Sequence, residues 1–444
     1  MAKKSLPRLL LLLTIALLLL PALSLSSFAQ ENKKVLAGYF EEWSIYYAGY
    51  NIANLQQNGV ADRLTHLFYA FANVTTTPAP ACAIADSWAD YQTPYLPSVS
   101  GDPYTGPMYG NFAAIQQLKQ LHPKLKVLMS IGGASAANTA AFVTASSTAA
   151  GRQALVASCI DMFVNGNVAP GITAPGLFDG FNIDWEYPTA SETQNFTALL
   201  AEFRSQLKAL SKNTGKKYEM SFDGPAGPQN YVNIDLKAAA KQVDFITAEG
   251  YNYAGSWDTQ TNHASPLFDS RQNPVYGQRL DIDDTVNAYL KAGVPPHKYV
   301  MGLPLYAAGW TGVPDVNHGL YQNSTGPSPV YLADGTGLCP DLSGNTPGCD
   351  TLLTPGVATY STLNNLASNG YRVSFDARRV AVTLYDPATM TFYTYENPYS
   401  MFLKMLYIDF RGLGGADVWA LKDDDANGTM VKTMAKGLGE REDR

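Results

Sequence analysis

The chain has 444 residues, of which 46% are hydrophobic and 11% aromatic, so it is long enough for one large globular domain with an insertion or for two or three ordinary domains. Its formal net charge is −7. Because the sequence holds no cluster of Lys and Arg that could neutralise phosphates, the composition argues against a nucleic-acid partner.

The N-terminus is typical of an export signal. Three basic residues within the first eight positions precede an apolar run over residues 9–20, and small residues allow cleavage after Ala29. We therefore expect residues 1–29 to be a signal peptide and the mature protein to be secreted, either outside the cell or into a periplasm. The alternative is an uncleaved anchor, but the apolar run falls short of the ~20 residues that span a bilayer, so we expect no stable membrane association.

Eight apolar runs of strand length follow, and stretches with helical periodicity separate them. Continuous apolar strands that alternate with amphipathic helices are typical of a parallel sheet covered on both faces. Eight such strands predict an α/β fold, a (β/α)8 TIM barrel. The expected strands are residues 34–40, 64–74, 126–133, 180–187, 218–225, 243–253, 299–306 and 415–421, and the clearest expected helices are 111–121, 152–165, 192–211 and 283–292.

Two connections are longer than one strand–helix unit requires. Residues 75–110 join the second strand to its helix, and we expect this loop to border the active-site face, as loops after barrel strands do. The segment from about 311 to 406 lies between the seventh and eighth strands and contains two runs of alternating polarity. It predicts a small α+β insertion domain within a catalytic barrel that spans residues 30–444.

The four cysteines agree with export into an oxidising compartment. Cys339 and Cys349 bracket a loop rich in Gly, Pro and Asp, and we expect a disulfide between them. Cys159 lies in a stretch of apolar periodicity, so we expect a buried thiol there and not a partner for the distant Cys82. No Cys/His spacing is typical of a metal site, and we expect neither a metal nor a cofactor.

Polar residues alternate along the expected fourth strand. Side chains of a strand point to opposite faces with period two, so Asn182, Asp184 and Glu186 share one face. The alternation also fits a half-exposed antiparallel strand whose acidic face meets water. In a barrel the same row points inward, and Glu186 lies nearest to a bound substrate. The other face carries Phe181, Ile183, Trp185 and Tyr187.

The acidic row and the aromatic residues at the strand ends together indicate a sugar polymer as substrate. Neighbouring carboxyl groups push one another's proton affinities apart, which leaves one of them usable as an acid near neutral pH. Flat aromatic rings can stack on the C–H faces of pyranose rings. The aromatic residues expected near the site are Tyr39, Trp43, Phe71, Tyr251, Tyr253, Tyr306 and Trp419.

With these residues in view, the sequence resembles glycoside hydrolase family 18, the chitinases and their relatives, over almost the whole mature chain. The resemblance rests on seven motifs in the order of the family's strands. They are GYFEEW at residues 38–43, YAFANV at 69–74, SIGG at 130–133, FDGFNIDWEYP at 178–188, YNYAGSWD at 251–258, GLPLYAAGW at 302–310 and GLGGADVWAL at 412–421.

The resemblance implies a retaining, substrate-assisted hydrolysis of β-1,4-linked N-acetylglucosamine polymers. Glu186 would be the general acid, Asp184 would orient the N-acetyl group of the substrate, and Tyr251 would hydrogen-bond to the acetamido oxygen. Trp419 would form the floor beneath the sugar that is cleaved. The remaining implied substrate-binding residues are Tyr39, Trp43, Phe71, Asn252 and Tyr306.

The sequence departs from the family pattern around the acetamido pocket and the substrate groove. Asn182 stands where the family has the middle Asp of its row, which removes a charge but keeps a hydrogen-bonding partner below Asp184. This change puts in doubt the usual sharing of a proton between the two positions. The other departures are Glu249 and Asp417 for Met, Asn252 for Asp, Ala308 for Arg and Ala134 for Trp.

Three readings of the function remain open at this point. The first is a chitinase that acts as a monomer on chitin or chitooligosaccharides. The second is an endo-β-N-acetylglucosaminidase that acts on N-glycans through the same acid and the same acetamide chemistry. The third is a chitin-binding lectin without activity, although such lectins generally lack the acid that Glu186 supplies.

Overall fold

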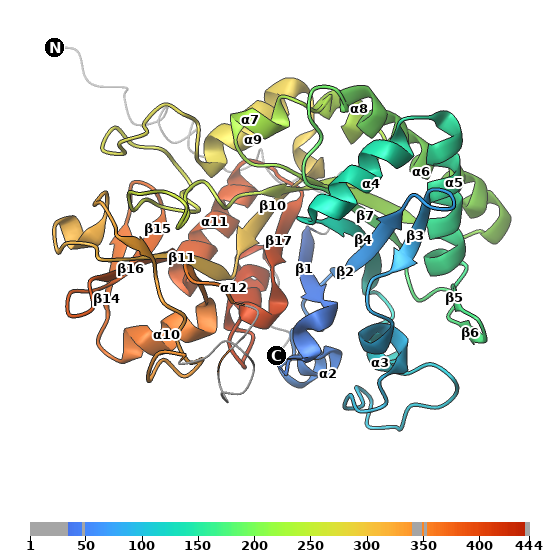
Figure 1. The fold of residues 1–444 in the computed structure, drawn as a ribbon, viewed down its shortest axis with the longest axis horizontal. Helices are drawn as coiled ribbons and strands as arrows, with labels where there is room; N and C mark the ends of the chain where they lie inside the picture. The colour runs from blue at the N-terminus through green and yellow to red at the C-terminus, as the bar shows by residue number, and fades with distance from the viewer. Residues whose placement is uncertain (1–33, 47–48, 340–348, 350–352, 440–444) are drawn as a thin grey trace, which may run out of the picture. The chain divides into compact units, whose positions relative to one another are not determined.

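The computed structural model describes residues 34–46, 49–339, 349 and 353–439 (Figure 1). The expected signal peptide, residues 1–29, lies outside the described residues. From Val35 onward the described residues belong to one compact unit. Within the described part of the chain, no helix combines the length and the apolar character needed to cross a membrane.

The centre of the structure is a closed barrel of parallel strands. Nine strands form one sheet in the order β1-β17-β10-β9-β8-β7-β4-β2-β3, and the pairing of β1 with β2 closes all of them except β3 into a barrel. The predicted barrel, with an insertion between its last two strands, is therefore confirmed. The barrel strands are β1 (Val35–Glu41), β2 (His66–Thr75), β4 (Lys126–Gly133), β7 (Gly180–Trp185), β8 (Glu219–Gly224), β9 (Phe245–Glu249), β10 (Tyr299–Pro304) and β17 (Gly415–Trp419).

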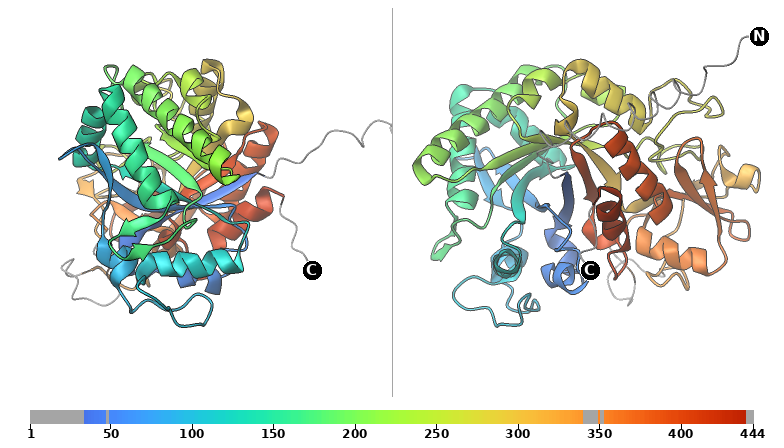
Figure 2. Two further views of the ribbon diagram at one scale, coloured as in Figure 1. Left: turned by 90° about the vertical axis from the view of Figure 1, so that its right-hand side faces the viewer. Right: turned by 180° about the vertical axis from the view of Figure 1, so that it is seen from behind.

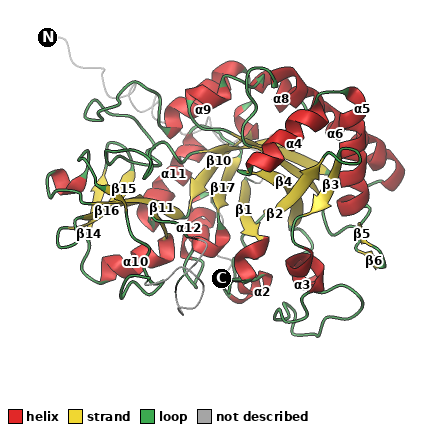
Figure 3. Ribbon diagram, in the orientation of Figure 1, coloured by secondary structure: helices red, strands yellow, loops and turns green. Residues whose placement is uncertain are grey.

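Helices surround the barrel, as Figure 3 shows in red around the yellow strands. Polar side chains cap several of them: the carboxylate of Asp281, for example, accepts a hydrogen bond from the backbone N–H of Asp284 at the start of α9. Figure 2 shows the same layer from two further sides. The helices are α2 (Ile52–Gln57), α3 (Gly110–Leu121), α4 (Ala136–Ser146), α5 (Ala149–Cys159), α6 (Thr193–Thr214), α7 (Pro228–Tyr231), α8 (Leu236–Ala240), α9 (Ile282–Ala292), α11 (Pro398–Phe410) and α12 (Thr429–Gly437).

The two faces of β7 meet different surroundings. The indole of Trp185 stacks on Phe142 of α4, with ring centroids 5.2 Å apart, and Phe181 packs on Phe203 of α6. Asn182 instead hydrogen-bonds across the barrel interior to the hydroxyl of Tyr39 on β1. The polar row therefore points into the barrel, and the reading as an antiparallel strand that faces water is wrong.

A second sheet lies between β10 and β17 in the chain. Its order is β12-β11-β16-β15-β14, with β13 paired to β11, and all these pairings are antiparallel. Figure 1 shows it in orange beside the barrel. The sheet begins at Tyr306 and its last strand ends at Tyr395, while the predicted domain limits remain a prediction. Its elements are β11 (Tyr306–Thr311), β12 (Gly326–Pro327), β13 (Val357–Thr359), α10 (Tyr360–Ser368), β14 (Arg372–Asp376), β15 (Ala381–Asp386) and β16 (Thr391–Tyr395).

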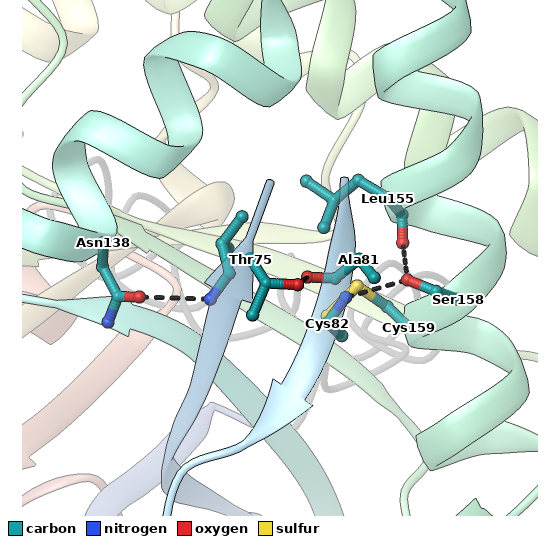
Figure 4. Close-up of a disulfide and its surroundings, with 8 residues drawn as sticks. Thr75, Ala81, Cys82, Asn138, Leu155, Ser158 and Cys159 are labelled. Carbon is teal, nitrogen blue, oxygen red and sulfur yellow. Dashed lines mark hydrogen bonds between the residues drawn. A yellow bond between two sulfur atoms is a disulfide. The ribbon is translucent and has the colours of Figure 1, made fainter. Parts of the chain in front are cut away.

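A disulfide joins Cys82 to Cys159, so the prediction of a buried thiol at Cys159 is wrong. Strand β3 (Ala81–Ile84) folds back along β2 and brings Cys82 against the C-terminal end of α5 (Figure 4). The Cα atoms of the two cysteines are 5.0 Å apart although 77 positions separate them in the sequence. The hydroxyl of Ser158 accepts a hydrogen bond of 2.8 Å from the backbone N–H of Cys82. The structure also pairs Cys339 with Cys349.

Candidate active site

A cavity of about 440 Å³ lies at the carboxyl ends of the barrel strands. The strand ends and the loops that follow them supply its walls, which is the usual place of the active site in this architecture. Nine of the site residues predicted from the sequence line it: Tyr39, Trp43, Phe71, Asp184, Glu186, Tyr251, Asn252, Tyr306 and Trp419.

Aromatic rings form one continuous wall of the cavity. Phe71 stacks on Trp419 with ring centroids 5.7 Å apart and an angle of 18° between the ring planes. Trp43 contacts Phe71 from the other side at 5.9 Å, and Tyr39 contacts Trp419 at 5.1 Å. These residues come from both ends of the chain, and closure of the barrel between β2, β1 and β17 brings them together. The wall offers flat apolar surface on which sugar rings can stack.

Two glycines at the end of β4 allow the close approach of these groups. A Cβ atom on Gly132 would lie 2.0 Å from the backbone oxygen of Asp184, and one on Gly133 would lie 2.7 Å from the ring of Phe71. Both glycines also have positive φ angles, of 122° and 83°. The Gly-Gly sequence therefore places β7 and the aromatic wall at their observed distance from β4.

Glu186 follows the last residue of β7 and lines the cavity. Burial raises the pKa of its carboxyl group, and the nearby Tyr187 hydroxyl partly offsets this effect. The hydroxyl of Thr139 in α4 donates a hydrogen bond of 2.7 Å to the backbone oxygen of Glu186, which holds the end of the strand. A carboxyl group that keeps its proton to higher pH can serve as a general acid.

Asp184 lies one alternation deeper and is 4% exposed. Its Oδ1 atom is buried, and no donor among the described residues hydrogen-bonds to it. Burial raises the pKa of Asp184 well above its usual range, and the charges of Glu186, Glu249 and Asp417 raise it further. Asp184 therefore has an unpaired acceptor atom in the cavity, and its carboxyl group tends to stay protonated when no substrate is bound to it.

Asn182 is fully buried and lies below the cavity instead of lining it. Its side-chain Nδ2 donates to the hydroxyls of Tyr39 at 2.8 Å and Ser130 at 3.0 Å, and its Oδ1 accepts from Ser221 at 2.7 Å. These bonds use both N–H groups of the amide, and none of the hydrogen bonds of Asn182 goes to Asp184, so the structure does not contain the expected hydrogen bond between the two residues. Asn182 instead ties β1, β4, β7 and β8 together inside the barrel.

Three further carboxyl groups surround the acidic row: Asp223 on β8, Glu249 on β9 and Asp417 on β17. Asp223 and Glu249 line the cavity, whereas Asp417 is 1% exposed and lies outside its lining. Burial raises the pKa of each, that of Glu249 to about 8, and the charge of Glu249 also raises the pKa values of the other two. The barrel interior thus brings carboxyl groups from three other strands around the acidic row, although Asn182 itself is neutral.

The alternation along the strand predicts that Tyr187 lies on the apolar face of β7. The structure does not place it there. The strand ends at Trp185, and the Tyr187 hydroxyl turns into the site, where it donates a hydrogen bond of 2.7 Å to Oε1 of Glu249. The backbone N–H of Ala226 donates to Oε2 of the same carboxylate at 3.1 Å. Glu249, at a position where the family pattern has Met, is therefore held on both oxygens.

The other predicted binding residues form the opposite side of the cavity. The hydroxyl of Tyr306 donates to Oδ1 of Asn252 at 2.7 Å, and Tyr251 meets Tyr306 edge to face at 6.0 Å. Asn252 has a φ angle of 59°, a conformation that Asn adopts more readily than most residues. Tyr253 points elsewhere, because its hydroxyl pairs with Thr285 of α9 at 2.6 Å.

Several lining residues escaped the sequence analysis. Asp223 and Asn73 were detectable, since they continue the period-two rows of Ser221 on β8 and Phe71 on β2, whereas Glu42, Ala85 and Asn138 lie on segments that carry no such pattern. Among the described residues, no group of three or more His, Cys, Asp or Glu side chains is arranged to hold a metal ion.

Comparison with known proteins assigns this site to a family. Residues 35–424 match the model of glycosyl hydrolases family 18. The chain belongs to this family. It is 29% identical to Chitinase 1 of Aphanocladium album over 410 residues, which cover 91% of this chain and 86% of that relative. Chitinase A1 of Niallia circulans is 27% identical, over 92% of this chain and 59% of its own length.

The same relationship is visible in solved structures. The catalytic domain of the psychrophilic chitinase B from Arthrobacter TAD20 superposes with a TM-score of 0.80 and 31% sequence identity, over 92% of this chain and 95% of that domain. Some family 18 relatives are much longer than the matched part, and the chain spans little more than half of Chitinase A1. As a family 18 protein in which Asp184 of β7 and Glu186 just after it line an aromatic cavity, the chain is a glycoside hydrolase.

Proposed function

We propose that the protein is a secreted chitinase that hydrolyses β-1,4-linked N-acetylglucosamine polymers with retention of anomeric configuration. The observation that carries the proposal is the unpaired Oδ1 atom of Asp184 beside Glu186 in the cavity. A buried acceptor without a donor is costly, and the N–H of a substrate acetamido group is a donor that would satisfy it. Relatives named chitinases over nine-tenths of this chain support the choice of substrate.

The proposed reaction uses the acetamido group of the substrate as the nucleophile. Glu186 transfers its proton to the glycosidic oxygen, and the bond between C1 and that oxygen breaks. Asp184 accepts a hydrogen bond from the acetamido N–H, and the Tyr251 hydroxyl donates to the acetamido oxygen. This oxygen bonds to C1 from the other face and gives an oxazolinium ion. Water then adds to C1, returns its proton to Glu186 and reopens the ring, so that two displacements retain the configuration.

The aromatic wall supplies the sugar-binding positions. Trp419 lies under the sugar whose bond is cleaved, with Tyr39 and Phe71 against the same ring, and Trp43 accepts a sugar farther along the chain. Asn252 and Tyr306 bind the substrate from the opposite side, and the hydrogen bond between them fixes their relative positions. Secretion through residues 1–29, and activity as a monomer without metal or cofactor, belong to the same proposal.

Products from three substrates distinguish the chitinase from its alternatives. The protein should release N-acetylglucosamine oligomers from chitin and from chitooligosaccharides, with the β-anomer formed first, as proton NMR can record. Cleavage of a high-mannose glycopeptide with little action on chitooligosaccharides would instead identify an endo-β-N-acetylglucosaminidase. Binding to chitin with no cleavage of any of the three substrates would identify a lectin.

The variant Glu186→Gln tests the proposed acid. It keeps the size and hydrogen bonding of the side chain but has no proton to transfer, so kcat should fall by at least ~10²–10⁴ while the thermal unfolding temperature stays close to that of the wild type. Asp409→Asn, an exposed carboxylate on α11, is the matched control and should keep full activity. Ordinary turnover by folded Glu186→Gln would refute the assignment.

A further inference from the structure

Two carboxyl groups are buried together at one end of the cavity, apart from the Asp184 row. Glu42 belongs to the short helical turn η1 (Glu42–Ile45) after β1, and Asp90 belongs to η2 (Trp88–Gln92) in the long loop after β2. They are 4% and 1% exposed, respectively. The reaction proposed above uses neither of them.

The surroundings of Asp90 come from three other elements. The hydroxyl of Tyr69 on β2 donates to Oδ1 of Asp90. Asn111 of α3 donates from Nδ2 to the Tyr69 hydroxyl at 3.1 Å and to the backbone oxygen of Glu42 at 3.2 Å. Gly110, with a φ angle of 62°, lies so near that a Cβ atom there would be 2.8 Å from the Asp90 backbone oxygen. Asp90 is thus enclosed on every described side.

The side chains of Glu42 and Asp90 lie close enough together for each to shift the pKa of the other. Two ionised carboxylates buried side by side would repel each other, so we expect one of the pair to keep a proton. Oε2 of Glu42 is buried and has no hydrogen-bond partner among the described residues, so it is free to take part in such sharing. The groups that face the pair are Asp86, whose charge is repulsive, and the hydroxyls of Tyr46 and Tyr69.

The electrostatics agree with one retained proton. Burial, and then the charge of Asp90, raise the pKa of Glu42 to about 11. Burial raises the pKa of Asp90 to about 7, although interactions with Tyr69 and Glu42 act in the opposite direction. Because these two groups titrate as a coupled pair, the first proton leaves near neutrality and the second is held far into the alkaline range.

The pair borders the sugar-binding wall. Glu42 itself lines the cavity, and the next residue, Trp43, is the ring that extends the aromatic wall through Phe71 to Trp419. A second, exposed link joins the same two turns, since the Tyr46 hydroxyl donates to Asp86 at 2.6 Å. The position of Trp43 therefore depends on how η1 is held against η2.

We propose that Glu42 and Asp90 share one proton and act as positioning residues that hold Trp43 in the substrate cavity, so that sugar binding at this end weakens when the pair loses that proton. The inference rests on the proposed function, because it assigns a sugar to Trp43. With both carboxylates ionised, their repulsion separates η1 from η2 and displaces the Trp43 ring from the wall.

Affinity measured against pH in a variant that cannot turn over tests the proposal. Calorimetric titration of chitotetraose into Glu186→Gln and into Glu186→Gln/Glu42→Gln, from pH 8 to pH 11, compares two proteins that share every other titrating group of the cavity. The amide that Glu42→Gln introduces donates to Asp90 at any pH, so it imitates the protonated pair. In Glu186→Gln, Kd should rise by about twofold at pH 11, where about half of the pairs have lost the shared proton, and it should rise clearly less in the double variant. The full effect beyond that pH is about tenfold, the factor for ~1.4 kcal/mol of lost aromatic contact.

Two outcomes separate this inference from the proposed function on which it rests. Parallel changes of Kd with pH in both proteins would overturn the proton-sharing pair and leave the chitinase proposal intact. Absence of binding at every pH would instead count against the proposed function. Asp90→Asn in the Glu186→Gln background is the second variant, because its amide donates to Glu42 and should give the same flattened profile.

Stability measured against pH supplies a readout without ligand. A carboxyl group with a raised pKa in the folded state contributes stability that is complete below its unfolded pKa, near 4.5 for Glu42, and is lost as the pH rises through the folded value. Between pH 5 and pH 9 the unfolding free energy of the wild type should therefore fall with pH more steeply than that of Glu42→Gln. Equal slopes would show that Glu42 holds no extra proton.

Discussion

The hydroxyl of Tyr187 and Oε1 of Glu249 are joined by a hydrogen bond of 2.7 Å between the end of β7 and the end of β9. Tyr187 directly follows the proposed acid, and its hydroxyl lies close enough to Glu186 to lower the pKa of that carboxyl group. One phenol therefore stands between the proposed acid and a buried carboxyl group whose pKa is raised to about 8. This arrangement couples the titration of the two carboxyl groups.

Two variants at this link should shift the pH–rate profile in opposite directions. Glu249→Gln removes a charge that raises the pKa of Asp184, whose carboxylate form accepts the acetamide N–H, so the acidic limb of kcat should move to lower pH. Tyr187→Phe removes a hydroxyl that lowers the pKa values of Glu186 and Glu249, so the alkaline limb should move to higher pH. Rates on one soluble chitooligosaccharide from pH 4 to pH 10 decide. Shifts of equal sign in the two variants would contradict the coupling.

Asn182→Asp should move the acidic limb of kcat to higher pH and change KM less. The three hydroxyls around residue 182, those of Tyr39, Ser130 and Ser221, can all turn to donate to a carboxylate, so the barrel can accept the change. The added charge further disfavours ionisation of Asp184, whose carboxylate form is the one that accepts the acetamide N–H. Normalised profiles of kcat against pH that superimpose for the two proteins would refute this electrostatic role.

Gly132→Ala should abolish most activity and destabilise the fold, because its Cβ would lie 2.0 Å from the Asp184 backbone oxygen and would force β7 away from β4. Gly171→Ala is the matched control, since Gly171 also has a positive φ, of 79°, with no atom within 4 Å of the added Cβ. The control should be destabilised only by the ~1–2 kcal/mol that a left-handed backbone conformation costs a residue with a Cβ atom, and it should keep its activity. Urea unfolding and specific activity measure both effects. Equal behaviour of the two variants would remove the case for a steric role of Gly132.

Lys404→Met should destabilise the protein by about 3–5 kcal/mol, the usual effect of breaking a buried ion pair. Lys404 of α11 pairs with Glu396 just after β16, both side chains are almost fully buried, and the ammonium group also donates to Ser265. The control is Arg372→Met, which breaks an exposed pair with Asp315 and should change stability by less than ~1 kcal/mol. Urea denaturation gives both values, and a loss of less than ~1 kcal/mol in Lys404→Met would contradict the prediction.

Removal of the disulfide between Cys82 and Cys159 should cost more stability than removal of the one between Cys339 and Cys349. The sequence separations are 77 and 10, and a crosslink that closes a longer loop restricts the unfolded chain more, by about 2 kcal/mol for this difference. Urea unfolding of Cys159→Ser and Cys349→Ser compares them, and reduced wild-type protein, which lacks both disulfides, gives the lower limit of stability. A larger loss in Cys349→Ser would oppose the loop-length argument.

Local patterns in the sequence were sufficient for the barrel and for the central part of the site. The row of Asn182, Asp184 and Glu186 follows from period-two alternation, which operates within a single strand and needs no knowledge of distant residues. The same patterns predicted helices close to α3, α6 and α9. They did not predict α4, because Ala136–Ser146 consists mainly of Ala, Ser and Thr and carries no clear apolar stripe.

The tertiary structure determines which residues surround the row of Asn182, Asp184 and Glu186. Closure of the barrel brings Asp223, Glu249 and Asp417 from three other strands toward Asp184, and the position of a residue along the chain does not say which strand end it will meet across the interior. The pairings of Cys82 with Cys159 and of Glu42 with Asp90 arise in the same way, because loops and a returning strand bring together segments that lie far apart in the sequence. Alternation within a strand determines which side chains face inward. Only packing in three dimensions determines which of them share a proton, a hydrogen bond or a covalent link.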